Sequence, residues 1–420
     1  MQHCDLLITN ASELLTCASS GKAKKGAEMK DLGIIARGAV AVKDGRILEA
    51  GSASALEAKY SPDQTLDAGD RVVMPGFVEC HTHLVFAGNR LDEFEQKIAG
   101  ADYLEILGKG GGILSTVAAT RKADLESLVT ASRPRLRKMV ESGVTTCEIK
   151  TGYGLDLETE RKMLEAIIRL GETEKIDIIP TFLPAHAVPP EFKGRADDYV
   201  ELICSVMLPQ IASEILPGLS VPIFVDVFCE KNAFDLGQSE KILERAKELG
   251  FALKAHVDEF TNLGGARMAI GLGATSIDHL DAISDEEVGL LASSDTIGVV
   301  TPTVNFNLGA KEFADARKMI DRGCAVAVST DYNPGSAPTP SPMMAMAIAA
   351  RYQKMLPAET INGATINGAF AAGVGSLCGS IEPGKLADML ICDVGDHREL
   401  VHEFGRNHVE LVVKRGEVIV

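Results

Sequence analysis

The sequence predicts an α/β fold, a (β/α)8 TIM barrel with a small β-sandwich domain built from both chain ends. Eight short runs rich in β-branched residues follow one another between residues 72 and 330, with helical patterns between them. The runs are continuously apolar rather than alternating, as in parallel strands that are covered by helices. Eight such strand–helix units are what a barrel of about 250 residues requires. A doubly wound open sheet, which rarely has eight units, is the alternative architecture.

The predicted strands and helices can be placed by residue number. The strands are 72–80, 144–150, 177–184, 223–230, 251–256, 275–280, 297–302 and 325–330. After the second strand, apolar residues recur at helical spacing in MLEAII (163–168). Gly143, Gly250 and Gly323 follow helical patterns where C-terminal cap glycines belong, so we expect a helix to end just before each of them.

Both chain ends predict β-hairpins rather than further strand–helix units. Residues 33–51 form two β runs around a KDGR turn, and residues 386–420 end in a hairpin around KRG. Neither end can bury a core alone. We therefore expect residues 1–70 and 380–420 to form one composite β-sandwich domain beside a barrel of residues 71–379.

Charge and cysteine usage limit the classes of partner and compartment. Acidic residues outnumber basic ones by 59 to 42, giving a formal net charge of -17. Nucleic acid and anionic membranes attract clustered positive charge, so neither is an expected partner. The nine cysteines are scattered without a C-x-x-C pair, which favours reduced thiols in a cytoplasm. We recognise no signal peptide and no segment approaching the ~20 apolar residues of a membrane span, and we expect a soluble cytoplasmic protein.

Five of the nine histidines and one aspartate fall at the carboxyl ends of predicted strands, which face the active-site mouth of a barrel. They are His81 and His83 on the first strand, His186 after the third, His256 on the fifth, His279 on the sixth and Asp331 on the eighth. A single histidine at a strand end is more often structural. Three imidazoles and a carboxylate at one mouth, however, suit a catalytic Zn²⁺ or Fe ion.

Two parts of the terminal regions are expected at the surface. One is the polar stretch CASSGKAKKGAEMKD (17–31), as a loop of the composite domain. The other is the set of remaining histidines, which are His3, His397, His402 and His408.

Several segments resemble known enzymes along nearly the whole chain. PGFVECHTH, the histidines of the fifth and sixth strands, STDYNPG and GSIEPGKLADMLICD resemble the amidohydrolase superfamily. HTHLVFAGNRLDEFEQKIAGADYLEIL, GGGILSTVAATR, EIKTGYGLD, TFLPAHAVPPEF and HVDEF are similar to its imidazolonepropionase family. The resemblance implies a metal-dependent hydrolase of histidine degradation. Its reaction would be the opening of the cyclic amide C–N bond of 4-imidazolone-5-propanoate to N-formimidoyl-L-glutamate by a metal-activated water.

The resemblance also implies roles for individual residues. Metal ligands fall on His81, His83, His256 and Asp331. Substrate contacts fall on Arg90, Tyr103, Tyr153, His186, Glu259, Asn333, Gly335 and Ser336, the last of which is often Thr in relatives. Catalytic roles fall on Asp331, Glu259, His279 and His186. The sequence does not decide which of His186, His279 and Glu259 moves the proton and which polarises the carbonyl group.

Two of these residues carry a specific chemistry and a plain alternative. The planar guanidinium of Arg90 matches the propionate carboxylate, but the same side chain can form a surface ion pair with Asp92 or Glu93. Tyr153 can donate a phenolic hydrogen bond to the substrate or pack as an aromatic residue under a loop. Lys150 is on the second strand rather than the fourth, where binuclear relatives place a bridging lysine, so we expect one metal ion.

The remaining alternatives concern the enzyme class and the barrel mouth. A nucleobase deaminase of the same superfamily shares the H-x-H pattern, and a non-catalytic scaffold would have lost metal ligands. The glycine-rich stretch 107–114 lacks the spacing of a phosphate-binding loop and is expected to be a loop at the mouth, with closure over the substrate as a hypothesis. The expected partner is a small anionic substrate, and relatives suggest a homodimer.

Overall fold

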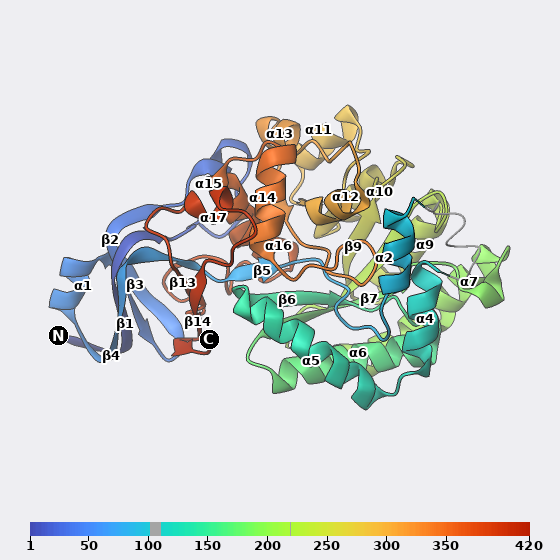
Figure 1. The fold of residues 1–420 in the computed structure, drawn as a ribbon. Helices are drawn as coiled ribbons and strands as arrows, with labels where there is room; N and C mark the ends of the chain where they lie inside the picture. The colour runs from blue at the N-terminus through green and yellow to red at the C-terminus, as the bar shows by residue number, and fades with distance from the viewer. Residues whose placement is uncertain (101–110, 219) are drawn as a thin grey trace.

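The computed structural model describes residues 1–100, 111–218 and 220–420, which form two sheets with helices around one of them (Figure 1). The larger sheet has eight parallel strands in the order β12-β11-β10-β9-β8-β7-β6-β5. They are β5 (Phe77–Glu79), β6 (Val144–Lys150), β7 (Asp177–Ala185), β8 (Phe224–Cys229), β9 (Ala252–Val257), β10 (Ser276–His279), β11 (Ile297–Val300) and β12 (Val326–Val328). The predicted fold class is confirmed, and β6 has the predicted bounds.

The ring closes where the first strand of this sheet meets the last. β5 and β12 stand at opposite ends of the strand order, and a parallel bridge joins Thr82 to Tyr332 just beyond them. The N–H of His83 donates to the carbonyl of Tyr332 at 2.9 Å. The hydroxyl of Ser329 donates to the buried carboxylate of Glu79. These contacts bring the ends of the first and eighth strands to one edge.

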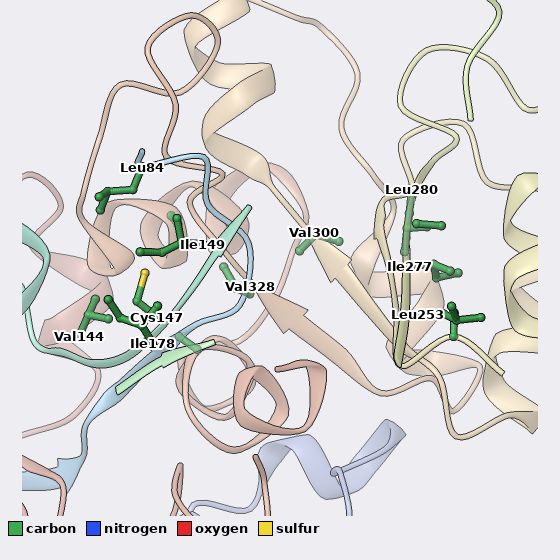
Figure 2. Close-up of a cluster of buried hydrophobic side chains, with 14 of the residues drawn as sticks. Leu84, Val144, Cys147, Ile149, Ile178, Leu253, Ile277, Leu280, Val300 and Val328 are labelled. Atoms are coloured by element: carbon green, nitrogen blue, oxygen red, sulfur yellow. The ribbon is translucent and has the colours of Figure 1, made fainter. Parts of the chain in front are cut away.

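Helices surround the eight-stranded sheet and bury its outward-facing side chains. They are α2 (Leu91–Ile98), α4 (Ile113–Lys122), α5 (Leu125–Glu141), α6 (Leu157–Thr173), η2 (Pro190–Phe192), α7 (Ala196–Leu202), η3 (Ile203–Met207), α8 (Leu208–Glu214), η4 (Leu216–Gly218), α9 (Leu236–Glu248), α10 (Gly265–Leu272), α11 (Asp285–Ser293), α12 (Pro302–Leu308), α13 (Ala316–Asp321), α14 (Pro342–Tyr352), α15 (Pro357–Ala364), α16 (Ile366–Ala371) and α17 (Glu399–His402). Figure 2 shows part of this core, including Ile149, Leu253 and Ile277 from β6, β9 and β10. The predicted cap glycines Gly143 and Gly250 follow α5 and α9 at φ +93° and +91°.

The smaller sheet combines strands from both chain ends in the order β15-β14-β13-β4-β1-β2-β3. The strands are β1 (Gln2–Leu15), β2 (Ile34–Lys43), β3 (Arg46–Ser52), β4 (Tyr60–Pro75), β13 (Met389–Cys392), β14 (Val409–Lys414) and β15 (Glu417–Val418), and α1 (Ala53–Lys59) lies between β3 and β4. Side chains alternate between its faces: Leu6 and Ile8 belong to one buried cluster, and Leu7 to another. β4 runs past residue 70 and leads directly into β5, joining the two sheets.

Residues 17–31 form a surface loop only in part: residues 20–22 and 30–31 are exposed as predicted, but the prediction is wrong for the buried positions between them. The segment contains η1 (Gly26–Lys30) and packs against the barrel, with Met29 fully buried. The N–H of Gly26 donates to the carbonyl of Cys324 at 3.1 Å. The amides of Asn362 and Asn367 donate to the carbonyls of Met29 and Lys24, both at 2.9 Å. Polar backbone groups of the segment are thus satisfied by side chains more than 300 residues away, which local polarity does not reveal.

One expectation about exposure is wrong, and one helical run passes the length and composition test for a membrane span. His408 is fully buried, with Nδ1 2.9 Å from Oδ1 of Asp393, whereas His3 and His402 are exposed as predicted. The helical run 196–218 contains an 18-residue window with the mean hydropathy, 1.4, of a membrane span, although no such segment was expected. Its inner face, including Tyr199 and Met207, is buried in the barrel core, so the run is an outer helix of the barrel.

Candidate active site

The inner surface of the barrel is polar because strand residues alternate in direction. Leu253 and Ala255 of β9 are part of the core beneath the helices, whereas Lys254 and His256, which alternate with them, face inward. The same alternation turns Asp278 of β10 inward, beside Ile277 in the core. Buried charged side chains therefore fill the barrel below the strand ends at which the predicted site residues lie.

The four residues predicted as metal ligands lie together and are at most 4% exposed. Nε2 of His81 is 3.6 Å from Oδ1 of Asp331, and Nε2 of His83 is 3.5 Å from the same oxygen. Nε2 of His256 is 3.4 Å from Nε2 of His83. The donor atoms of His81, His83 and Asp331 all lie within 4.8 Å of one another. Residues from β9 and from the ends of β5 and β12 thus come together at the carboxyl end of the barrel strands.

Two aspartates accept hydrogen bonds from the Nδ1 atoms of His81 and His256, which point away from the cluster. Nδ1 of His81 donates to Oδ2 of Asp278 at 2.6 Å, and Nδ1 of His256 donates to Oδ1 of Asp226 at 3.1 Å. A proton fixed on Nδ1 leaves the lone pair on Nε2, the atom that faces the cluster. The sequence analysis did not identify Asp226 or Asp278. The alternation within IFVDVFCE and TSIDHL was the available signal, since it places both carboxylates inside the barrel.

The cluster fits a metal ion by its protonation and by its unpaired nitrogens. Burial lowers the pKa of His81 and of His83 well below the ordinary histidine value, so both are neutral, as ligands must be. Among the residues that the structure describes, the buried Nε2 of His81 has no hydrogen-bond partner. Three neutral imidazoles and a carboxylate are a donor set that Zn²⁺ and Fe both accept.

The loop after β12 orients Asp331 through Asn333. Asp331 has a left-handed backbone, φ +49°, and the amide of Asn333 donates to its carbonyl at 2.8 Å and to Oδ1 at 3.2 Å. Oδ1 of Asn333 accepts from the N–H groups of Gly335 and Ser336, both at 2.8 Å. The amide of Asn333 also donates to Oγ of Ser336 at 2.8 Å. The contacts of Asn333 are thus within its own loop.

His279 and Glu259 lie on one side of the cluster. Nδ1 of His279 is 3.0 Å from the hydroxyl of Thr301, and its Nε2 is 3.9 Å from Oε2 of Glu259. Burial lowers the pKa of His279 well below its usual value. Burial, with the nearby charge of Asp331, raises the pKa of Glu259 well above the ordinary value.

His186 and Tyr153 lie on the other side. The ring of Tyr153 is 5.8 Å from that of His83 and 5.5 Å from that of His186, measured between centroids. Nδ1 of His186 is 3.1 Å from the carbonyl of Gly152, to which it donates. Burial, and after it the charge of His256, lowers the pKa of His186 to about 3. Burial also raises the pKa of Tyr153 above its usual value, so its phenol keeps its proton.

Arg90 forms an ion pair and still lies inside the protein, with a side chain only 11% exposed. Its Nε donates to Oε2 of Glu93 at 2.8 Å, and its Nη2 donates to Oε1, which is the pairing foreseen as an alternative. A Cβ added to Gly335 would lie 2.2 Å from Nη1 of Arg90. The guanidinium therefore lies against the loop that carries Asp331, with Nη1 directed at Gly335. Tyr103 and part of the stretch 107–114 lie outside the described residues.

Lys150 is not available to bridge metal ions. Its ammonium is fully buried and lies 2.8 Å from Asp226 and 2.9 Å from Glu148. Both partners are carboxylates, which hold the amine in its charged form.

Comparisons with known proteins agree with this geometry. Residues 230–419 match the model of the amidohydrolase family. The chain is 49% identical over 424 residues to an imidazolonepropionase of Chloroflexus aggregans, a match covering 100% of this chain and 99% of the relative. An imidazolonepropionase of Herpetosiphon aurantiacus is 45% identical over 421 residues, covering 100% and 98%. A crystal structure of an adenosine deaminase from Xanthomonas campestris with bound zinc shares the fold, with a TM-score of 0.72, 19% identity and 99% and 93% of the two chains covered. The chain therefore belongs to the imidazolonepropionase family within the amidohydrolases.

Proposed function

We propose that the protein is a metal-dependent cyclic amidohydrolase of histidine degradation. It hydrolyses 4-imidazolone-5-propanoate to N-formimidoyl-L-glutamate. The observation that carries the proposal is a buried set of three imidazoles and a carboxylate in a chain that matches imidazolonepropionases over its full length.

One Zn²⁺ or Fe ion would be held by His81, His83, His256 and Asp331. The chemistry that such an ion supplies when bound is a water whose pKa falls to about 7, so that hydroxide is present at neutral pH. Metal analysis of the purified chain distinguishes the two elements. A chain that neither carries nor takes up metal would contradict the proposal.

The protein side chains must transfer one proton from the attacking water to the leaving ring nitrogen. Hydrolysis adds the oxygen of water to the ring carbonyl carbon and breaks the adjacent C–N bond, and a proton of that water must reach the ring nitrogen. Asp331 is placed to accept the proton, because its Oδ1 faces the histidine cluster. Glu259, whose pKa is raised by burial and by Asp331, is suited to deliver a proton to the nitrogen.

The hydrogen bonds of the two remaining histidines favour His279 as the group that polarises the carbonyl oxygen. Nδ1 of His279 lies 3.0 Å from the hydroxyl of Thr301, and we infer the tautomer in which this hydroxyl donates and Nε2 keeps the proton for donation to the substrate. His186 has the opposite tautomer, because its Nδ1 faces the carbonyl of Gly152 and must carry the proton. Its neutral Nε2 is an acceptor and cannot stabilise a developing negative charge.

Arg90 is the proposed partner of the substrate carboxylate. Among the described residues, Glu93 holds Nε and Nη2 of Arg90, and Nη1 is proposed to bind the propionate. Replacing Arg90 by Met should lower kcat/KM, and the corresponding loss of transition-state stabilisation should be about 1.5–3 kcal/mol, the range for a charged hydrogen bond. The matched control is Arg195→Met, which removes an exposed arginine paired with Asp198 at the same i,i+3 spacing. An unchanged kcat/KM in Arg90→Met would contradict the carboxylate assignment.

The direct test of the activity is to follow the loss of imidazolonepropionate and the appearance of N-formimidoyl-L-glutamate with the purified, metal-loaded chain. Ammonia release from nucleobases or nucleosides without ring opening would instead make it a deaminase. We also propose a cytoplasmic homodimer that acts without nucleic acid or membrane. The nine buried, unpaired cysteines support a reducing compartment, and light scattering of the purified protein would show a monomer if the dimer proposal is wrong.

A further inference from the structure

Lys150 occupies the centre of a charge network below the histidine cluster. It ends β6, its side chain is fully buried, and its Nζ contacts three carboxylates from three strands. The distances are 2.9 Å to Glu148, 2.8 Å to Oδ2 of Asp226 and 3.7 Å to Oδ2 of Asp278. A buried ammonium is tolerated only when it is paired in this way, so its place in the barrel is strongly determined.

Two of the three carboxylates are those that hold the ligand imidazoles. Asp278 accepts from Nδ1 of His81, and Asp226 accepts from Nδ1 of His256. Among the residues that the structure describes, Lys150 is the side chain with an ion pair to both aspartates, and each aspartate links it to one imidazole. Two buried carboxylates this close repel each other, and the ammonium between them offsets that repulsion.

We propose that Lys150 is a positioning residue of the metal centre. By holding Asp226 and Asp278 in one arrangement, it fixes the orientation of His256 and His81, so that both Nε2 atoms face the same point. The inference rests on the proposed metal-binding role of these histidines. Groups that orient metal ligands from behind typically change metal affinity 10- to 100-fold when they are removed.

The chain offers a matched control in Lys414 of β14. This lysine is also buried, 7% exposed, and its Nζ also lies between two aspartates, 2.7 Å from Asp177 and 2.7 Å from Asp388. It lies where the smaller sheet meets the barrel, and the partners found for Asp177 and Asp388 include no histidine. Lys414→Met thus removes the same kind of buried ion pair without touching the cluster.

The experiment compares Lys150→Met, Lys414→Met and the unaltered chain as folded, full-length proteins. Zn²⁺ affinity is measured by competition with a chelator, and the ligand geometry is read from the visible absorption of protein produced with Co²⁺. We expect Lys150→Met to bind Zn²⁺ 10- to 100-fold more weakly and to show an altered Co²⁺ spectrum. Lys414→Met should lose stability only and keep the affinity and spectrum of the unaltered chain.

Each outcome has one meaning. Affinity and spectrum unchanged in Lys150→Met would overturn the positioning role and leave the proposed function standing. Failure of the unaltered chain to bind either Zn²⁺ or Fe would overturn the proposed function itself. If Lys150→Met does not fold, the double variant Lys150→Met/Glu148→Gln removes one buried charge of each sign, and an unchanged affinity in that variant overturns the proposal equally.

Discussion

The imidazole of His186 stacks on that of His83, with ring centroids 4.7 Å apart and planes inclined by 13°. His186 is kept in this position by its hydrogen bond to Gly152, whose own backbone has φ +103°. A Cβ at Gly152 would lie 2.8 Å from Nδ1 of His186. The lack of a side chain at Gly152 is thus required for His186 to stack on His83.

Gly152→Ala should disturb this pair and the activity. The new methyl group would be strained at positive φ, at a cost of about 1–3 kcal/mol, and would displace His186 from His83. We expect a lower melting temperature and a lower kcat/KM. The control is Gly271→Ala in α10, where a Cβ meets nothing within 4 Å, so stability should stay the same or rise. Unchanged kinetics in Gly152→Ala would show that the stacking is dispensable.

Gly335→Ala should act through Arg90. The added Cβ would lie 2.2 Å from Nη1 and 2.6 Å from Cζ of Arg90, so the guanidinium must move. We expect a rise in KM, and hence a fall in kcat/KM that approaches the fall caused by Arg90→Met. The double variant Arg90→Met/Gly335→Ala should be no worse than Arg90→Met alone, because both changes remove the same contact. Additive losses in steady-state kinetics would mean that Gly335 has a separate role.

Removal of the metal should lower both activity and stability. A ligand present at 1,000 times its dissociation constant stabilises a folded protein by about 4 kcal/mol, so chelation should lower the melting temperature measurably. His81→Ala should show the same low melting temperature with or without added Zn²⁺. His402→Ala, at an exposed position, should respond to Zn²⁺ like the unaltered chain. A Zn²⁺-dependent rise in His81→Ala equal to that of the control would contradict His81 as a ligand.

Low pH should weaken the ion pair between Arg90 and Glu93. Burial raises the pKa of the Glu93 carboxyl, but hydrogen bonds from Arg90 and Lys97 and from the N–H of Gly112 outweigh burial and lower that pKa to about 2. A carboxyl whose folded pKa is lowered stabilises the protein above its unfolded value, about 4.5, and loses that contribution as the pH falls towards 2.

The measurement for this prediction is the free energy of unfolding of the unaltered chain and of Glu93→Gln between pH 7 and pH 2.5. The unaltered chain should be more stable at neutral pH. The difference should shrink as the pH falls below about 4.5. A difference that does not change with pH would mean that the charge of Glu93 contributes nothing to folding.

The eight strands could be predicted because each is a short apolar run that carries its own signal. The ligand set followed from the strand ends, since parallel strands of one barrel share a mouth. The aspartates that accept hydrogen bonds from the ligand histidines were harder to predict. Nδ1 of His81 meets Asp278 across 197 residues, and nothing local to either residue indicates the other.

Local polarity misled the predictions in two places. The lysines and glycines of residues 17–31 suggest solvent exposure, but Lys24 and Met29 are buried, and their carbonyls accept hydrogen bonds from the amides of Asn367 and Asn362. His408 is predicted at the surface of the chain end, but it is buried beside Asp393. In both cases the deciding partners are individual polar side chains, which composition cannot reveal.

The closure of the barrel between Thr82 and Tyr332 sets a time order for synthesis. Glu79 and Ser329, which meet at this seam, are 250 residues apart in the chain. A ribosome releases His81 and His83 early, but the proposed carboxylate ligand emerges only with the eighth strand. The nascent chain therefore holds an incomplete ligand set until the barrel can close, so full metal affinity should appear only after β12 has left the ribosome.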